Sequence, residues 1–232
     1  MNIKTLDELA DEFDSDKSTK SSYPSRHGYA PIYEKLLSKW KNEPISLLEI
    51  GVCMEGSRGG QSVRMWEAYF EKAKIYTFDI VDMSRLKNNR VDFFRGDQSK
   101  RTDFENMMKA FNVSFFDFIL EDGCHVHEHQ MISIGSLFKR VKPGGYYILE
   151  DISVPERECC CQRNDQTFGV IQNYIKTNKF ESSLITEEEQ KYLEDNISDI
   201  KIYDDIQNAY CVAIFTKKEE LSYEESYLLN IL

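Results

Sequence analysis

The sequence predicts an α/β fold: a Rossmann-like, seven-stranded sheet, mostly parallel, with a C-terminal antiparallel hairpin and helices on both faces. Through the middle of the chain, short apolar runs alternate with segments of helical periodicity, a pattern typical of parallel sheets whose crossovers are helices. Two later runs, 199–205 and 210–218, lie too close together for a helical crossover. They therefore predict an antiparallel hairpin at the sheet edge.

Each element follows from a local pattern. Helical spacing predicts two helices before the first strand, over 6–13 and 29–40. Apolar runs predict five parallel strands at 46–52, 74–80, 91–97, 116–122 and 146–152. Helices are expected between them at 61–70, 102–111 and 128–141. The last of these should stop at the Lys-Pro-Gly-Gly stretch that begins at Lys142, because proline and glycine break helices.

Composition limits the function classes. With 232 residues, 41% of them hydrophobic, the chain can bury one good core. A net charge of −11 disfavours a nucleic-acid partner and an anionic membrane surface. No apolar run approaches the roughly 20 residues that span a bilayer, and the polar, acidic start is unlike a signal peptide. We therefore expect no membrane insertion and a cytoplasmic protein whose six cysteines stay reduced.

Acidic residues mark the ends of the central strands. They are Glu49, Asp79, Asp97, Glu121, Asp122, Glu150 and Asp151. Turn formation and helix capping would explain any one of them. Ligands of open α/β sheets, however, bind beyond the carboxyl ends of the strands. So many acids at that edge favour a functional site.

The residues after the first strand indicate the kind of cofactor. An acid at the end of the second strand, here Asp79, accepts hydrogen bonds from ribose hydroxyls in nucleotide-binding folds. The turn over 51–56 lacks both the G-x-G-x-x-G pattern and a Walker lysine, and Glu49 would repel phosphates. S-adenosylmethionine has a ribose, no phosphate and a cationic sulfonium, so it fits better. Gly51 would then allow close approach of the backbone, and Asp97 and Gln98 would bond the adenine.

Several motifs in order resemble those of class I S-adenosylmethionine-dependent methyltransferases. More narrowly, they are similar to the metal-dependent sugar O-methyltransferases of the macrocin and mycinamicin type, with cephalosporin-hydroxylase-like relatives. The resemblance rests on LADEFDSDKST and HGYAPIYE, LLEIGV, GGQSVRMWEAYF, IYTFDIVDMS, GDQS, FDFILEDGCH, VKPGGYYILEDIS and the final IKIYDDIQNAYCVAIFTK. It implies a methyltransferase domain over 41–218, a helical lead-in over 1–40 that caps the active site, and a tail over 219–232.

The resemblance also implies roles for individual residues. Asp122 and Asp151 would be ligands of Mg²⁺ or Mn²⁺, with Glu150 beside them as a further ligand or partner. His125 would be the general base that takes the proton of a sugar hydroxyl, on a glycan or a glycoside. His27 and Tyr29 of the lead-in would close over the cofactor or the acceptor. Independently of the resemblance, Glu121 should point away from Asp122, because neighbouring side chains of a strand alternate, and we assign it to the cofactor.

Alternatives stay open at this point. Cys124, His125, His127, His129 and the cysteines at 159–161 could suggest zinc, but no paired C-x-x-C spacing supports it. We expect His127 at the rim of the site and the unmatched segment 156–169 on the acceptor side. A phenolic, catechol-type acceptor is a second reading, and a non-catalytic binding protein of the same fold is a third. A homo-oligomer is possible.

Overall fold

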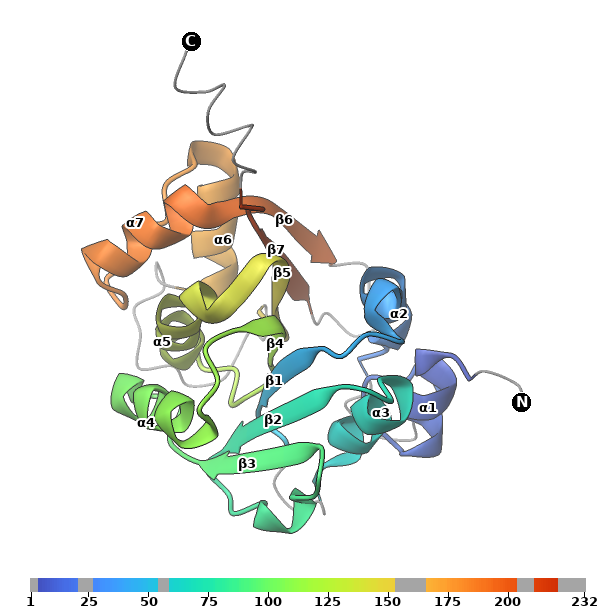
Figure 1. Ribbon diagram of the computed structural model, residues 1–232. Coiled ribbons are helices and arrows are strands. Elements are labelled where there is room, and N and C mark those ends of the chain that lie inside the picture. Colours follow the sequence, from blue (N-terminus) through green and yellow to red (C-terminus); the bar gives the residue numbers. More distant parts are fainter. Residues whose placement is uncertain (1–3, 21–26, 54–58, 153–165, 204–210, 221–232) are drawn as a thin grey trace.

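A seven-stranded sheet forms the centre of the computed structural model, which describes residues 4–20, 27–53, 59–152, 166–203 and 211–220 (Figure 1). The strands are β1 Ser46–Ile50, β2 Lys74–Asp79, β3 Val91–Arg95, β4 Phe116–Glu121, β5 Val141–Leu149, β6 Ile197–Tyr203 and β7 Val212–Lys217. Their spatial order is β3-β2-β1-β4-β5-β7-β6. Pairs from β3 to β5 are parallel, and β7 is antiparallel to both β5 and β6. The predicted fold class is confirmed.

Helices cover both faces of this sheet. They are α1 Leu6–Glu12, α2 Ala30–Leu37, α3 Gln61–Tyr69, α4 Arg101–Phe111, α5 His127–Leu137, α6 Thr167–Thr177 and α7 Glu187–Asn196, with 3-10 turns η1 Ser38–Trp40, η2 Ser84–Leu86 and η3 Phe138–Arg140. Figure 1 shows α1, α2 and α3 on one face and α4 to α7 on the other. No helix among the described residues is both long and apolar enough to cross a membrane.

The alternation of side chains along the strands explains the two cores. Leu47 of β1 and Phe118 of β4 pack with the first three helices, where Trp66 is fully buried. Their neighbours Leu48 and Ile119 pack with the helices of the opposite face. Because successive side chains of a strand point to opposite faces, a strand that is buried on both faces is apolar throughout.

Two boundaries differ clearly from the predictions. The predicted helix 128–141 ends at Leu137, η3 follows, and β5 already begins at Val141. The Pro-Gly-Gly stretch therefore lies within β5, where a register shift against β4 accommodates it. Two helices, α6 and α7, were not predicted. A sequence signal existed for α7, since Thr186 and Glu189 form a capping box at its start.

The closest backbone approach at the site edge involves Gly51, directly after β1. Its φ is +82°, and a Cβ atom there would lie 2.0 Å from the carbonyl oxygen of Asp122. The amide of Asp122 in turn donates to the carbonyl of Ile50 at 2.8 Å. A side chain at position 51 would therefore push the ends of β1 and β4 apart.

Gly51→Ala should lower the free energy of unfolding by about 3 kcal/mol, because it combines an unfavourable φ with a clash against main chain. Gly169→Ala is the matched control, since this exposed helical glycine has no atom within 4 Å of a built Cβ. It should stabilise by about 0.5 kcal/mol through helix propensity. Urea unfolding curves measure both, and similar effects of the two changes would contradict the role given to Gly51.

Candidate functional site

Main-chain hydrogen bonds bring the strand-end acids to one edge of the sheet. The amide of Gly51 donates to Phe78 at 2.9 Å, and the amide of Glu150 donates to Glu121 at 3.0 Å. Glu49, Asp79, Glu121, Glu150 and Asp151 are all buried there, and the side chain of Asp122 is 13% exposed. Parallel pairing thus converts acids far apart in sequence into one cluster.

Lys17 lies in the middle of this cluster, although sequence reasoning gave it no role. It is fully buried, and its Nζ lies 2.5 Å from Asp122 Oδ2, 3.2 Å from Glu150 Oε2 and 3.4 Å from Asp16 Oδ1. The only available signal was its place in the Asp-Lys pair of the lead-in, because a lysine in a polar segment reads as a surface residue.

The same N-terminal segment supplies two tyrosine donors. Tyr29 Oη donates to Asp151 Oδ1 at 2.7 Å, and Tyr33 Oη donates to Glu150 Oε1 at 2.6 Å. His27 Nδ1 lies 3.5 Å from Asp151 Oδ1. The structure therefore places His27 and Tyr29 against Asp151, and their role toward the cofactor or the acceptor stays a prediction.

His125 faces the oxygens that the lead-in does not bond. Its Nε2 lies 3.7 Å from Asp122 Oδ1 and 3.5 Å from Asp151 Oδ2. One ligand atom from each of Asp122, His125 and Asp151 can be chosen so that all lie within 4.8 Å of one another. His125 and Asp151 also have positive φ values, +57° and +55°. Such strain in residues other than glycine is concentrated at functional sites.

The electrostatics of the cluster favour a cation. Burial raises the pKa of Asp151 to about 7, and the neighbouring Asp122 adds to the effect. Burial also raises the pKa of Asp122 and, more strongly, that of Glu150. For Lys17, burial acts to lower the pKa, but Asp122 and Asp16 outweigh it, so the pKa is raised well above its usual value. The ammonium is therefore charged. The raised pKa values of the carboxyl groups show that it does not fully offset their burial and mutual repulsion, so a bound cation would favour their ionised forms.

Two more acids of this edge are buried with incomplete hydrogen bonding. Both oxygens of Glu49 lack a partner among the described residues, although Ser62 and Trp66 lie nearby, and burial raises its pKa to about 7. Glu121 Oε1 accepts from the Gln98 side chain and from the Gly123 amide, while Oε2 has no described partner. Burial raises the pKa of Glu121 to about 8.

The remaining cofactor residues have structural partners. Asp79 accepts from the amides of Val52, Cys53 and Val81 at 2.8–2.9 Å, which leaves about one of its four lone-pair positions for a ribose hydroxyl. The side-chain nitrogen of Gln98 also donates to the Ser133 hydroxyl, and its side-chain oxygen accepts from the main-chain amide of Cys124. Ile80, directly after Asp79, is 61% exposed, and sequence reasoning gave it no role.

Asp97 lies in the turn before α4. Its carboxylate accepts hydrogen bonds from Ser99 and pairs with Lys100. Burial raises the pKa of Asp97, but these partners outweigh it and lower the value to about 2. Its contacts are those of a turn residue, and its role toward adenine stays a prediction.

The other histidines have separate places. His127 is buried, and its Nδ1 accepts from the amide of Thr167 at 2.9 Å, so the expectation of a rim position was wrong. His129 Nδ1 lies 2.7 Å from Cys124 Sγ. The cysteines at 159–161 and most of the segment 156–169 lie outside the described residues.

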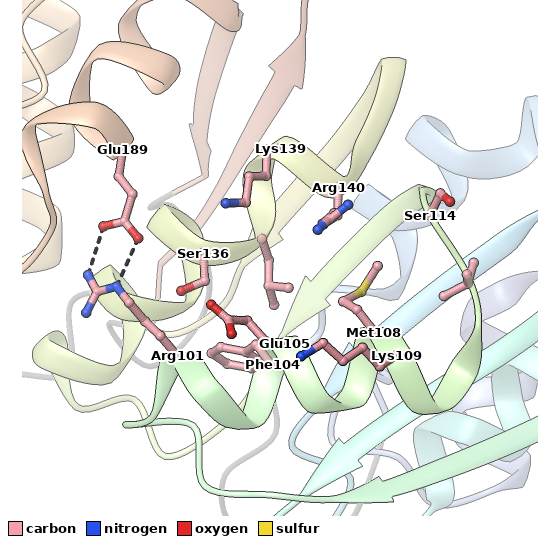
Figure 2. Close-up of a pocket in the computed structure, with 12 residues that line it drawn as sticks. Arg101, Phe104, Glu105, Met108, Lys109, Ser114, Ser136, Lys139, Arg140 and Glu189 are labelled. Atoms are coloured by element: carbon pink, nitrogen blue, oxygen red, sulfur yellow. Dashed lines mark hydrogen bonds and ion pairs between the residues drawn. The ribbon is translucent and has the colours of Figure 1, made fainter.

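An open groove of about 440 Å³ lies between α4 and α5, apart from the acids (Figure 2). At one end Arg101 makes a paired contact with Glu189 of α7, and at the other Ser114 and Arg140 lie before β4 and β5. None of the residues that line this groove is a strand-end acid. It belongs to a different part of the molecule.

Comparison with known proteins gives a consistent picture. No protein-family model matches the chain. It is 33% identical over 128 residues to mycinamicin VI 2''-O-methyltransferase of Micromonospora griseorubida, covering 54% of this chain and 32% of that protein. To demethylmacrocin O-methyltransferase of Streptomyces fradiae it is 34% identical over 130 residues, covering 55% and 32%. The matches thus span about a third of these relatives' length.

Solved structures extend the likeness to nearly the whole chain. The MycE methyltransferase of the mycinamycin pathway, in complex with Mg, S-adenosylhomocysteine (SAH) and mycinamycin VI, superposes with a TM-score of 0.75 at 24% identity, covering 94% of this chain and 56% of that one. An O-methyltransferase from Bacillus cereus in complex with SAH gives 0.51 at 13% identity, covering 91% and 90%. The chain thus has the class I S-adenosylmethionine-dependent methyltransferase fold and is similar to the sugar O-methyltransferases of mycinamicin and macrocin.

Proposed function

We propose that the chain is an S-adenosylmethionine- and Mg²⁺-dependent O-methyltransferase acting on a sugar hydroxyl of a glycoside or glycan. One observation carries the proposal: Asp122, His125 and Asp151 converge at the carboxyl ends of β4 and β5, with ligand atoms within 4.8 Å of one another. The similarity to methyltransferases named for mycinamicin and macrocin supports the choice of acceptor.

The donor set fits a hard divalent cation. Asp122 Oδ1 and Asp151 Oδ2 would hold it, because Lys17 and Tyr29 bond the opposite oxygens of these carboxylates. Both oxygens of Glu150 accept hydrogen bonds, from Lys17 and Tyr33. Glu150 would therefore support the site without binding the cation directly. Carboxylate oxygens suit Mg²⁺. When bound, the cation would make an acceptor hydroxyl more acidic.

His125 would accept the proton of the acceptor hydroxyl at Nε2 as the methyl group passes from the sulfonium to the oxygen. The carbon–sulfur bond breaks, the carbon–oxygen bond forms, and the thioether product leaves neutral. Asp79 would accept from a ribose hydroxyl, and Ile80 would offer an apolar surface to the adenine. Glu121 and Gln98 would shape this side of the pocket.

Glu49 would face the positive charge of the cofactor. A buried carboxylate without a partner is costly, so a cationic ligand stabilises it. Residues 1–40 would form the cap, since Lys17, Tyr29 and Tyr33 bond the carboxylates from outside the sheet. We place the protein in the cytoplasm, supported by the free thiol of Cys211.

Glu49→Gln should weaken S-adenosylmethionine binding about tenfold yet stabilise the ligand-free protein. The folded-state pKa of Glu49 is about 7, above its ordinary 4.5, so ionisation costs stability as pH rises between these values. The neutral amide removes a cost of about 3 kcal/mol at pH 8 and almost none at pH 4.5. Calorimetry and urea unfolding at both pH values test this. Unchanged affinity, or destabilisation at pH 8, would contradict it.

Removal of divalent cations should abolish methyl transfer, and Mg²⁺ or Mn²⁺ should restore it. Asp122→Asn should lower Mg²⁺ affinity at least tenfold by calorimetry, because a ligand charge is lost. Asp92→Asn is the matched control, since Asp92 of β3 pairs with Lys74 at a 35% exposed position. Full activity in chelator, with mycinamicin VI and catechol each tried as acceptor, would reject the cation site.

His125→Ala should lower turnover 10²–10⁴-fold, the usual contribution of a general base, while affinity for SAH stays within about twofold. His127→Ala should leave turnover near that of the wild type. It should instead cost about 1–3 kcal/mol of stability, because the buried amide of Thr167 loses its acceptor. Methyl transfer to the accepted glycoside and thermal unfolding separate the two effects. Equal, mild losses of turnover would remove His125 from the mechanism.

A further inference from the structure

Lys17 bonds two carboxylates that come from different strands. Its fully buried ammonium contacts Asp122, which follows β4, and Glu150, which follows β5, and it also lies 3.4 Å from Asp16. A lysine is almost never fully buried unless it is paired. The ion pairs with Asp122 and Glu150 explain the burial of Lys17.

Lys17 uses different oxygens from those available to a cation. It bonds Oδ2 of Asp122 and Oε2 of Glu150, while Oδ1 of Asp122 and Oδ2 of Asp151 are turned toward His125. The ammonium and a divalent cation can therefore occupy the cluster together. Asp122 would be shared between them.

The net charge of the cluster links the Lys17 ammonium to the affinity for a cation. Asp16, Asp122, Glu150 and Asp151 carry a formal charge of −4, and the ammonium reduces it to −3. One divalent cation would reduce it further, to −1. In the cation-free protein the charge of the ammonium opposes the repulsion among these carboxylates, and the hydroxyls of Tyr29 and Tyr33 add hydrogen bonds. Once a cation is bound, two positive charges lie close together at low exposure, where their repulsion is poorly screened.

We propose that Lys17 is the resident counter-ion of the cation site. It fixes Asp122 and Glu150 before a cation binds, remains in place when one does, and keeps the affinity for that cation lower than the carboxylates alone would give. The inference rests on the cation site proposed above. It makes Lys17 a positioning residue, without contact to the methyl donor or acceptor.

The test compares Lys17→Met with the wild-type protein by Mg²⁺ calorimetry and thermal unfolding. In EDTA the variant should unfold about 10 °C lower, because buried carboxylates lose their partner. It should nevertheless bind Mg²⁺ about tenfold more tightly, and Mg²⁺ should raise its Tm more than that of the wild type. A purely structural lysine would not produce tighter binding.

Lys4→Met is the matched control. Lys4 makes an ion pair of 2.7 Å with Glu12 in the same N-terminal segment, but both side chains are about half exposed. Its loss should change neither the Tm in EDTA nor the Mg²⁺ affinity measurably. The wild-type titration separates the two proposals: no Mg²⁺ binding at all would reject the cation site, whereas binding that is not tightened by Lys17→Met would reject the counter-ion.

A measurement on the wild-type protein covers the case in which the variant does not fold. With ¹⁵N-labelled lysine, the buried Lys17 ammonium should give a slowly exchanging signal in EDTA that shifts on addition of Mg²⁺ and stays protected. Lys217 is an internal reference, since its buried ammonium bonds the carbonyls of Lys139 and Val141. If no protected ammonium signal responds to Mg²⁺, or if the responding signal loses its protection, the proposal is wrong.

Discussion

Burial of carboxylates at one sheet edge is the constraint on which the site depends. Parallel strands bring their carboxyl ends together, and here β1, β2, β4 and β5 all deliver acids to that edge. Buried like charges remain close only if donors or cations oppose their repulsion and replace the lost water. The sheet itself offers few such donors, and the segment before β1 supplies them through one ammonium and two phenols.

This dependence explains why the N-terminal helices are part of the same fold. Leu6, Leu9 and Tyr33 share a core with Trp66 of α3 and Phe118 of β4. Apolar packing on one face of the sheet thus fixes the position from which Lys17, Tyr29 and Tyr33 reach the strand ends. Hydrophobic burial positions the polar contacts, and the polar contacts neutralise the edge.

Periodicity alone predicted the sheet, because apolar runs and breakers are local signals. It misjudged the start of β5, where Pro143 and Gly144 are absorbed by a register shift that only pairing with β4 defines. Strand-end acids were predictable for the same local reason, since each follows an apolar run. The separate roles of these acids could not be predicted, because they depend on contacts between distant segments. Such contacts decide which oxygen of Asp122 is bonded and why Lys17 is buried. They also explain why His127 is buried against Thr167.

The contacts of Lys17 also say something about the order in which the molecule can assemble. They close loops of 105 and 133 residues, to Asp122 and to Glu150. Contacts of such high sequence separation form after local ones, since the entropy of loop closure opposes them until other packing is in place. During synthesis the lead-in leaves the ribosome before β4 and β5, so its lysine lacks Asp122 and Glu150 until those strands follow. Until then the apolar faces of α1 and α2 are not covered by the complete sheet. During this interval chaperones could bind the nascent chain, and the chain could aggregate.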